Sequence, residues 1–184
     1  VYQYTNNTWS QLGQDIDGEL NADYSGAKVV LSIDGTIVAI SSHNNDGNGS
    51  QSGHVRVYQY TNNTWNQVGG DIDGEAEGDQ SSRGVSLSSD GSIVAIGAPY
   101  NDANGINAIG HVRVYQRDTY KTVAVTDQNN SSFGPVGWTR LGQDIDGDVE
   151  NDTAGTGVSL SSDGSILAVG VPGYNRITGS QAGR

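Results

Sequence analysis

Short segments of alternating apolar and polar residues run along the chain in a pattern typical of β-strands. Residues 54–60 (His-Val-Arg-Val-Tyr-Gln-Tyr) alternate, as expected of a strand with two different faces. Residues 93–96 (Ile-Val-Ala-Ile) are continuously apolar, which indicates a strand covered on both faces. No stretch of ten residues has the 3.6-residue periodicity of an amphipathic helix. The pattern predicts an all-β chain.

Turn-forming residues join these strands into hairpins. Residues 61–64 (Thr-Asn-Asn-Thr) favour a turn because Asn tolerates positive φ, and a further strand is expected at residues 65–69. The strand expected at residues 85–88 leads into Ser-Asp-Gly at residues 89–91, a strong hairpin signal. Each unit is therefore expected to contain four antiparallel strands.

The whole pattern is repeated. Residues 57–65 are identical to residues 1–9, and Asp-Ile-Asp-Gly begins at Asp15, Asp71 and Asp144. The first interval is 56 residues and the second is 73, lengthened by an insertion. A period in this range indicates a repeat architecture, in which each unit buries its faces against copies of itself.

Four short antiparallel strands in a repeat of this length describe one blade of a β-propeller. We predict an all-β fold of such blades in about three tandem repeats, an incomplete propeller; a solenoid of β-coils is the alternative. The chain starts and stops inside a strand pair, which suggests either an excerpt from a longer array or half blades completed by neighbouring copies. The expected limits are a half blade at 1–25, a blade at 26–81, a blade at 82–154 carrying an insertion at 117–137, and a half blade at 155–184.

The insertion is the one segment found in a single copy. Residues 122–125 (Thr-Val-Ala-Val) predict an extra strand within it. A loop added to a repeat is where binding specificity is commonly located.

A longer string carries a family resemblance. Residues 84–99 (Gly-Val-Ser-Leu-Ser-Ser-Asp-Gly-Ser-Ile-Val-Ala-Ile-Gly-Ala-Pro) resemble the FG-GAP type of propeller repeat, which is related to the head of the integrin α-subunit, and residues 157–172 repeat the string closely. The resemblance implies a propeller fold and an extracellular protein. It does not transfer the calcium loop of the integrin type, because a bare Ser-Asp-Gly-Ser turn stands in its place at residues 89–92.

Composition narrows the classes of partner. The formal net charge is −12, from 21 acidic and 9 basic residues, which argues against nucleic-acid binding and is compatible with cation binding or with solubility alone. No apolar run approaches the roughly 18 residues of a transmembrane helix, so no membrane span is expected. The chain has no Cys and therefore no disulfide or thiolate metal site.

An acidic loop after each Trp-containing strand is the best candidate for a metal site. Oxygen-bearing side chains at loop positions 1, 3, 5, 7 and 9 resemble the spacing of calcium loops, although Gly falls at position 4 rather than 6. The alternative is that the first two Asp residues cap turns and the others are solvated. The candidate Ca²⁺ ligands are Asp15, Asp17, Glu19 and Asp23 in the first loop, Asp71, Asp73, Glu75 and Asp79 in the second, and Asp144, Asp146, Asp148 and Asp152 in the third.

Six asparagines lie in N-x-S/T sequons, which predicts glycosylation if the protein is secreted by a eukaryote. The alternative is that Asn-Asn simply makes a good hairpin turn. These residues are Asn6, Asn48, Asn62, Asn129, Asn130 and Asn151.

Catalytic signals are weak, and we do not expect an enzyme. His54 and His111 are equivalent in the repeat, which favours a structural role such as hydrogen bonding where a strand begins. The series Trp9, Trp65 and Trp138 suits either packing between blades or stacking against sugars.

These observations together predict an extracellular or cell-surface scaffold with a structural or adhesive role, possibly within a filament or larger array. Its expected partners are other copies of itself or further repeats of a longer chain, and glycans or matrix proteins. A calcium-dependent module that binds carbohydrate or matrix is the alternative.

Overall fold

The computed structural model describes residues 1–103, 105–173 and 183–184, and within these residues it contains strands and no helix. The strands are β1 (Tyr2–Thr5), β2 (Thr8–Gln11), β3 (Val29–Leu31), β4 (Ile37–Ser42), β5 (His54–Thr61), β6 (Thr64–Gln67), β7 (Ile72–Asp73), β8 (Gly84–Leu87), β9 (Ile93–Ala98), β10 (His111–Arg117), β11 (Trp138–Arg140), β12 (Ile145–Asp146), β13 (Gly157–Leu160) and β14 (Leu167–Gly170).

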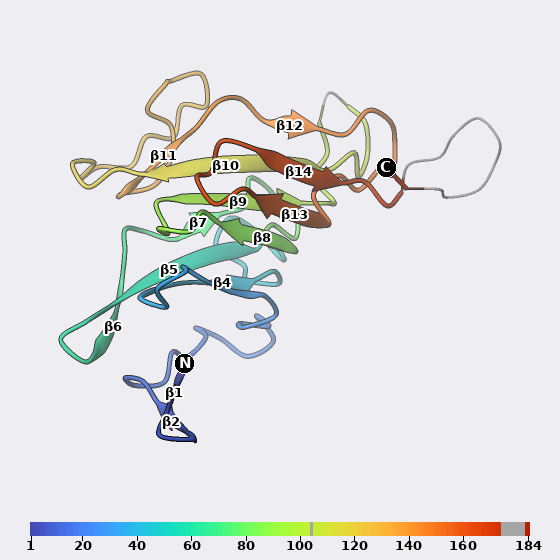
Figure 1. Ribbon diagram of the computed structural model, residues 1–184. Helices are drawn as coiled ribbons and strands as arrows, with labels where there is room; N and C mark the ends of the chain where they lie inside the picture. Colours follow the sequence, from blue (N-terminus) through green and yellow to red (C-terminus); the bar gives the residue numbers. More distant parts are fainter. Residues whose placement is uncertain (104, 174–182) are drawn as a thin grey trace.

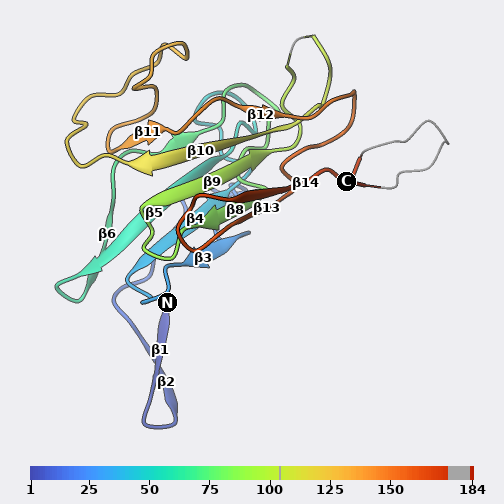
Figure 2. The ribbon, with the colours of Figure 1, turned by 45° about the horizontal axis from the view of Figure 1, so that its top comes forward.

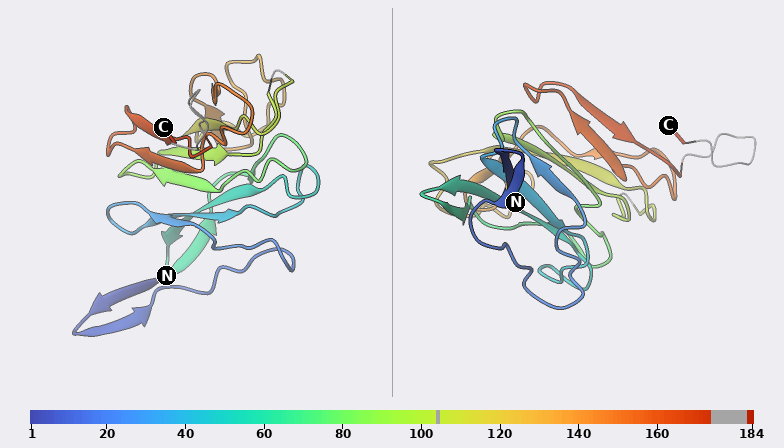
Figure 3. Two further views of the ribbon diagram at one scale, coloured as in Figure 1. Left: turned by 90° about the vertical axis from the view of Figure 1, so that its right-hand side faces the viewer. Right: turned by 60° about the horizontal axis from the view of Figure 1, so that its bottom comes forward.

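The strands form two large antiparallel sheets and two hairpins. One sheet has the order β3-β4-β5-β6, with β7 also paired to β5; the other has the order β8-β9-β10-β11, with β12 also paired to β10. Figures 1 and 3 show the sheets stacked in chain order, from the β1–β2 hairpin near the N-terminus to the β13–β14 hairpin. Figure 2 shows the β1–β2 hairpin projecting from the stack. The predicted all-β fold of antiparallel propeller blades in an incomplete array is confirmed.

The fourth strand of each large sheet is divided in two. The second half of β5 pairs with β6, while His54 and Val55 at its start pair with β7. Gly69 and Gly70 lie in the gap between β6 and β7, and β11 and β12 divide in the same way against β10. Residues 71–79, expected to form a loop, therefore contain the short strand β7. A strand of two residues is too short for alternation to reveal it.

The hydrophobic core lies in layers between sheets. On β9, Val94 and Ile96 pack into the layer shared with β4 and β5, whereas Ala95 packs into the layer shared with the β13–β14 hairpin. Successive side chains of a strand point to opposite faces, so one apolar run serves two layers. The prediction that residues 93–96 are covered on both faces is confirmed.

A tryptophan joins each large sheet to the preceding layer. Trp65 Nε1 donates to the carbonyl oxygen of Leu12 at 2.7 Å, and Trp138 Nε1 donates to that of Val68 at 3.0 Å. Both tryptophans are buried, whereas Trp9, at the equivalent position of the first repeat, is 66% exposed. We call this contact the Trp joint. It accounts for two of the three tryptophans as packing residues.

A glycine makes room for each buried indole. Gly13 and Gly69 have φ of +75° and +74°, in the left-handed region that favours glycine. A Cβ at Gly13 would lie 2.8 Å from Cδ1 of Trp65, and one at Gly69 would lie 2.8 Å from Cδ1 of Trp138. Gly142 has a similar φ of +79°, but nothing lies within 4 Å of its Cβ position. The joint therefore requires glycine both for the backbone conformation and for close approach.

The insertion is a loop without the strand predicted at residues 122–125. A single bridge joins Val125 to Gly134, and the side chains of Tyr120 and Val123 are exposed. Apart from the bridge at Val125, residues 122–125 pair with no strand of the described part of the chain, and β propensity alone does not make a strand. The prediction of an extra strand was wrong.

Replacing the buried tryptophan of the second joint tests its contribution to stability. Trp138→Ala should lower the free energy of unfolding by about 3–5 kcal/mol, because it empties a fully buried site and leaves the Val68 carbonyl without its donor. Trp9→Ala is the matched control, and its effect in dilute solution should stay below about 0.5 kcal/mol. Urea unfolding followed by circular dichroism measures both. Similar losses of stability in Trp138→Ala and Trp9→Ala would contradict a specific contribution of the Trp joint.

Candidate functional site

Charged residues from two successive repeats meet at the start of β5. Arg56 donates to both oxygens of Asp71, from Nε at 2.9 Å and from Nη2 at 2.8 Å, and its Nη2 also pairs with Glu19. His54 is buried beside them, and its Nδ1 lies 4.0 Å from Glu19 Oε2, 3.9 Å from Asp71 Oδ2 and 3.8 Å from Asp73 Oδ1. None of these separations is a hydrogen bond. These five residues are called the first cluster.

The same arrangement recurs at the start of β10. Arg113 donates to both oxygens of Asp144, from Nε at 2.8 Å and from Nη2 at 2.7 Å, and pairs with Glu75. His111 is buried, with Nδ1 3.6 Å from Glu75 Oε2. These four residues are called the second cluster. In each cluster the glutamate comes from one acidic loop, and the aspartate comes from the next.

The two clusters differ in charge. Gln67 donates to Asp71 in the first cluster, whereas the equivalent residue in the second is Arg140, whose Nη1 lies 3.1 Å from Asp144 Oδ1. Gln128 of the insertion also reaches the second cluster, donating to Glu75. The second cluster is therefore surrounded by more positive charge and more donors than the first.

Burial and ion pairing act in opposite directions on the first cluster. Burial alone would raise the pKa of Asp71, but the hydrogen bonds led by Arg56 outweigh it and lower that pKa. Burial, together with the charges of Asp71 and Glu19, raises the pKa of Asp73 to about 6. Burial lowers the pKa of His54, so its imidazole is neutral at pH 7.

The structure gathers carboxylates of successive loops rather than those of one loop. Among the described residues, the sets of three His, Asp or Glu ligand atoms lying within 4.8 Å of one another are Glu19–His54–Asp71 and Glu75–His111–Asp144. These sets draw on two loops at once, so the spacing of residues within one loop does not predict them. Calcium binding by the loops stays a prediction.

The last acidic residue of each loop turns inward and binds the loop itself. Asp79 accepts hydrogen bonds from the Ala76 N–H at 3.1 Å and from Asn101 Nδ2 at 3.0 Å. Asp23 accepts equivalent bonds from Leu20 and Asn45, and Asp152 accepts from the N–H groups of Asp148 and Val149. Of the other predicted ligands, Asp15 accepts from Gln11, Asp148 pairs with Arg184, and Asp17 and Asp146 are exposed.

Two residues of the clusters were not predicted from the sequence. Arg56 and Arg113 organise the clusters, yet neither was selected as a candidate. The signal was available, because His-Val-Arg-Val-Tyr-Gln occurs unchanged at residues 54–59 and 111–116. An arginine kept at the same place in both copies, next to a kept histidine, indicates a shared contact.

The Asp-Gly turn between the first two strands of each repeat is held by hydrogen bonds to its own aspartate. Asp163 Oδ1 accepts hydrogen bonds from Ser161 Oγ at 2.6 Å and from the N–H and Oγ of Ser165 at 3.1 and 2.9 Å. The turns at Asp34 and Asp90 contain the same bonds. These bonds, led by Ser161, lower the pKa of Asp163 to about 2. The carboxylate is thus used to hold the turn.

All six sequon asparagines are exposed, and they lie in turns and loops outside the strands. Asn6 and Asn62 have φ of 51° and 53° at the tips of the β1–β2 and β5–β6 hairpins. Asn48 donates from Nδ2 to the Gly74 carbonyl at 2.8 Å. Asn129 and Asn130 lie in the insertion, and Asn151 lies in the third acidic loop. Glycosylation stays a prediction.

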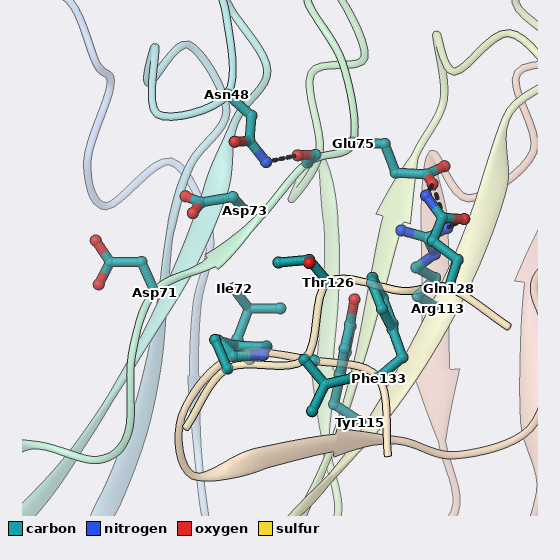
Figure 4. Close-up of a pocket in the computed structure, with 15 residues that line it drawn as sticks. Asn48, Asp71, Ile72, Asp73, Glu75, Arg113, Tyr115, Thr126, Gln128 and Phe133 are labelled. Carbon is teal, nitrogen blue, oxygen red and sulfur yellow. Dashed lines mark hydrogen bonds and ion pairs between the residues drawn. The ribbon is translucent and has the colours of Figure 1, made fainter. Parts of the chain in front are cut away.

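A cavity of about 400 Å³ lies beneath the insertion. Figure 4 shows Asp71 and Asp73 on one side and Tyr115 and Phe133 on the other. Gln128 stands at its rim and accepts a hydrogen bond from Arg113 Nη2 at 3.1 Å. The cavity thus combines carboxylates, aromatic rings and hydrogen-bonding groups, as many ligand pockets do.

Comparison with protein-family models and with curated proteins found no match to this chain. The resemblance to FG-GAP repeats therefore rests on residues 84–99 and 157–172 and stays a prediction. The described residues include no helix of the length and apolarity needed to cross a membrane.

The turn at Asp163 gives a direct pH test. Its carboxyl should titrate with a midpoint near pH 2, below the ordinary value of 3.8, when followed by carboxyl carbon NMR. A lowered pKa stabilises the folded chain above the ordinary value, and this contribution is lost as the pH falls through the folded value. Ser161→Ala should move the midpoint upward. An unchanged midpoint in that variant would show that the hydroxyl does not hold the carboxylate.

Proposed function

We propose that this chain is a structural or adhesive scaffold, located outside the cell or on its surface, in which propeller blades add to one another through the Trp joint. Its expected partners are further blades of the same kind. The repeated surface supports this proposal, because a regular array offers similar faces at regular intervals rather than a single irregular pocket.

The observation that carries the proposal is that both halves of the joint are accessible at opposite ends of the stack. Trp9 is the exposed counterpart of Trp65 and Trp138. At the other end Leu141 is 44% exposed and stands at the position of Leu12 and Val68, whose carbonyls accept the indole N–H. Nothing lies within 4 Å of the Cβ position of Gly142, so the space that Trp138 fills over Gly69 is open there to an incoming indole.

The hairpins at the two ends are complementary halves of a blade. The β1–β2 hairpin corresponds to β5–β6, and the β13–β14 hairpin corresponds to β8–β9. In both complete blades the second strand pairs with the third along six residues. An edge of β14 could pair with an edge of β1 in the same register, which would cover two exposed strand edges at once.

An extracellular location has separate support. Six exposed sequons, the acidic net charge and the resemblance to extracellular propeller repeats all agree with it.

Self-association of the isolated chain tests the scaffold proposal. Sedimentation velocity at increasing protein concentration should reveal oligomers, and Trp9→Ala should weaken association by about 30-fold, the effect of losing a 2 kcal/mol interface residue. Tyr120→Ala removes another exposed aromatic residue, in the insertion, and should leave association unchanged. A chain that stays monomeric, or associates equally well without Trp9, would refute the proposal.

Carbohydrate or matrix binding is the second candidate, and the cavity beneath the insertion favours it. Sugars are commonly held by an aromatic face together with carboxylates and amides, and Phe133, Asp71, Asp73 and Gln128 supply these groups.

A glycan array tests this second function. Binding should fall at least tenfold when Gln128→Ala removes the amide at the cavity rim, and it should persist in Trp9→Ala, because Trp9 lies outside the cavity. Absence of binding to any glycan, or equal losses in the two variants, would contradict a role for the cavity.

A further inference from the structure

We propose that Glu19, His54, Asp71 and Asp73 of the first cluster bind a divalent transition-metal ion such as Zn²⁺, at the junction between the first two repeats. This site differs from the calcium loops expected from spacing, because it takes its ligands from two loops and from a strand-end histidine. It does not depend on the proposed scaffold function.

The buried histidine supplies the first reason. The His54 side chain is 3% exposed, and its Nδ1 has no hydrogen-bond partner. Buried polar atoms are nearly always partnered, since an unpartnered one costs about 1–3 kcal/mol. Three carboxylates surround Nδ1 at 3.8–4.0 Å, too far for a hydrogen bond. A cation between them would satisfy the nitrogen and the oxygens together.

The separations suit a small tetrahedral ion after a modest contraction. Zinc lies about 2.0–2.2 Å from nitrogen and oxygen ligands, which places tetrahedral ligand atoms about 3.4 Å apart. The separations of Glu19, Asp71 and Asp73 from His54 Nδ1 exceed this value by about half an ångström. Glu19, His54 and Asp71 already present ligand atoms within 4.8 Å of one another, whereas Asp73 lies outside this set and has to approach the other carboxylates. The Glu19 side chain is 42% exposed and lies outside the strands, so it can approach while Arg56 stays paired to its other oxygen; its hydrogen bond from Asn45 Nδ2 would be exchanged for the ion.

The charge balance also favours a divalent ion. Three carboxylates face one guanidinium, that of Arg56. A divalent cation would neutralise the two negative charges that remain. Arg56 Nη2 pairs with both Asp71 and Glu19, and carboxylate ligands of metal ions are commonly hydrogen-bonded in this way by supporting residues. An imidazole among carboxylates favours zinc or a related ion over calcium, which prefers oxygen ligands alone.

The fourth ligand is accommodated by a glycine. A Cβ at Gly47 would lie 2.8 Å from Asp73 Oδ1, so any other residue there would press on the carboxylate. The equivalent residue of the next repeat is Ala103, and there the counterpart of Asp73 is the exposed Asp146.

The second cluster serves as a comparison within the same chain. Its two carboxylates, Glu75 and Asp144, face two guanidinium groups, those of Arg113 and Arg140. Among the ion pairs of the described residues, His111 has one carboxylate partner, whereas His54 has three. The second cluster lacks both the excess negative charge and the fourth ligand, so we expect it not to bind the ion.

Isothermal titration of the metal-free chain with ZnCl₂ tests the proposal. We expect one equivalent to bind to the 184-residue chain. His54→Gln should weaken binding by more than the roughly 10–100-fold that loss of a supporting residue costs. The matched variant His111→Gln should bind as the parent does. Addition of Co²⁺ should give visible absorption typical of a tetrahedral site, and His54→Gln should abolish it.

A second variant keeps the proposal testable if His54→Gln does not fold. The Asp73 carboxylate lies 3.8 Å from His54 Nδ1, beyond hydrogen-bond distance, so Asp73→Asn should fold normally by circular dichroism and still bind Zn²⁺ more weakly. Three results would overturn the proposal: absence of Zn²⁺ binding, binding unaffected by His54→Gln and Asp73→Asn, or equal losses in His54→Gln and His111→Gln.

Discussion

The structure depends on one constraint: each large sheet is apolar on both faces and is stable only between two neighbours. The strand β9 shows this directly, with Val94 and Ile96 buried in one layer and Ala95 in the next. The Trp joint adds direction to this stacking, because the indole N–H of one blade finds its acceptor on the blade before it. Burial supplies the attraction between layers, and the hydrogen bond fixes their offset.

Because successive blades stack with a fixed offset, residues that lie about one repeat apart in the sequence are brought close together in space. Glu19 and Asp71 are separated by 52 residues, the difference of their numbers, yet the same guanidinium binds both. The second cluster repeats the contact between Glu75 and Asp144. Small substitutions between repeats then give the two junctions different chemistry. Gln67 in the first junction corresponds to Arg140 in the second, which changes the local charge. Gly47 corresponds to Ala103, and Gly47 leaves space beside the Asp73 carboxylate.

Much of the fold could be predicted from the sequence, because strands and turns leave local signals that occur more than once. The hairpin at residues 85–96 is an example, since both its alternation and its Asp-Gly turn lie within a dozen residues. The candidate site was harder to predict from the sequence. Its partners come from different repeats, and a spacing argument confined to one loop cannot place Glu19 beside His54. The strand predicted at residues 122–125 failed for the related reason that local propensity does not supply a pairing partner.

The insertion has a consequence for how the chain reaches its native arrangement. Residues 1–9 and 57–65 are identical, so the tips of the β1–β2 and β5–β6 hairpins present the same side chains. Identical segments of this kind favour domain swapping and misassembly in repeat proteins. The third copy has no such twin, because residues 117–137 interrupt it. Loops of unequal length are a general means of removing degenerate topologies. The insertion thus distinguishes one blade from its otherwise similar neighbours.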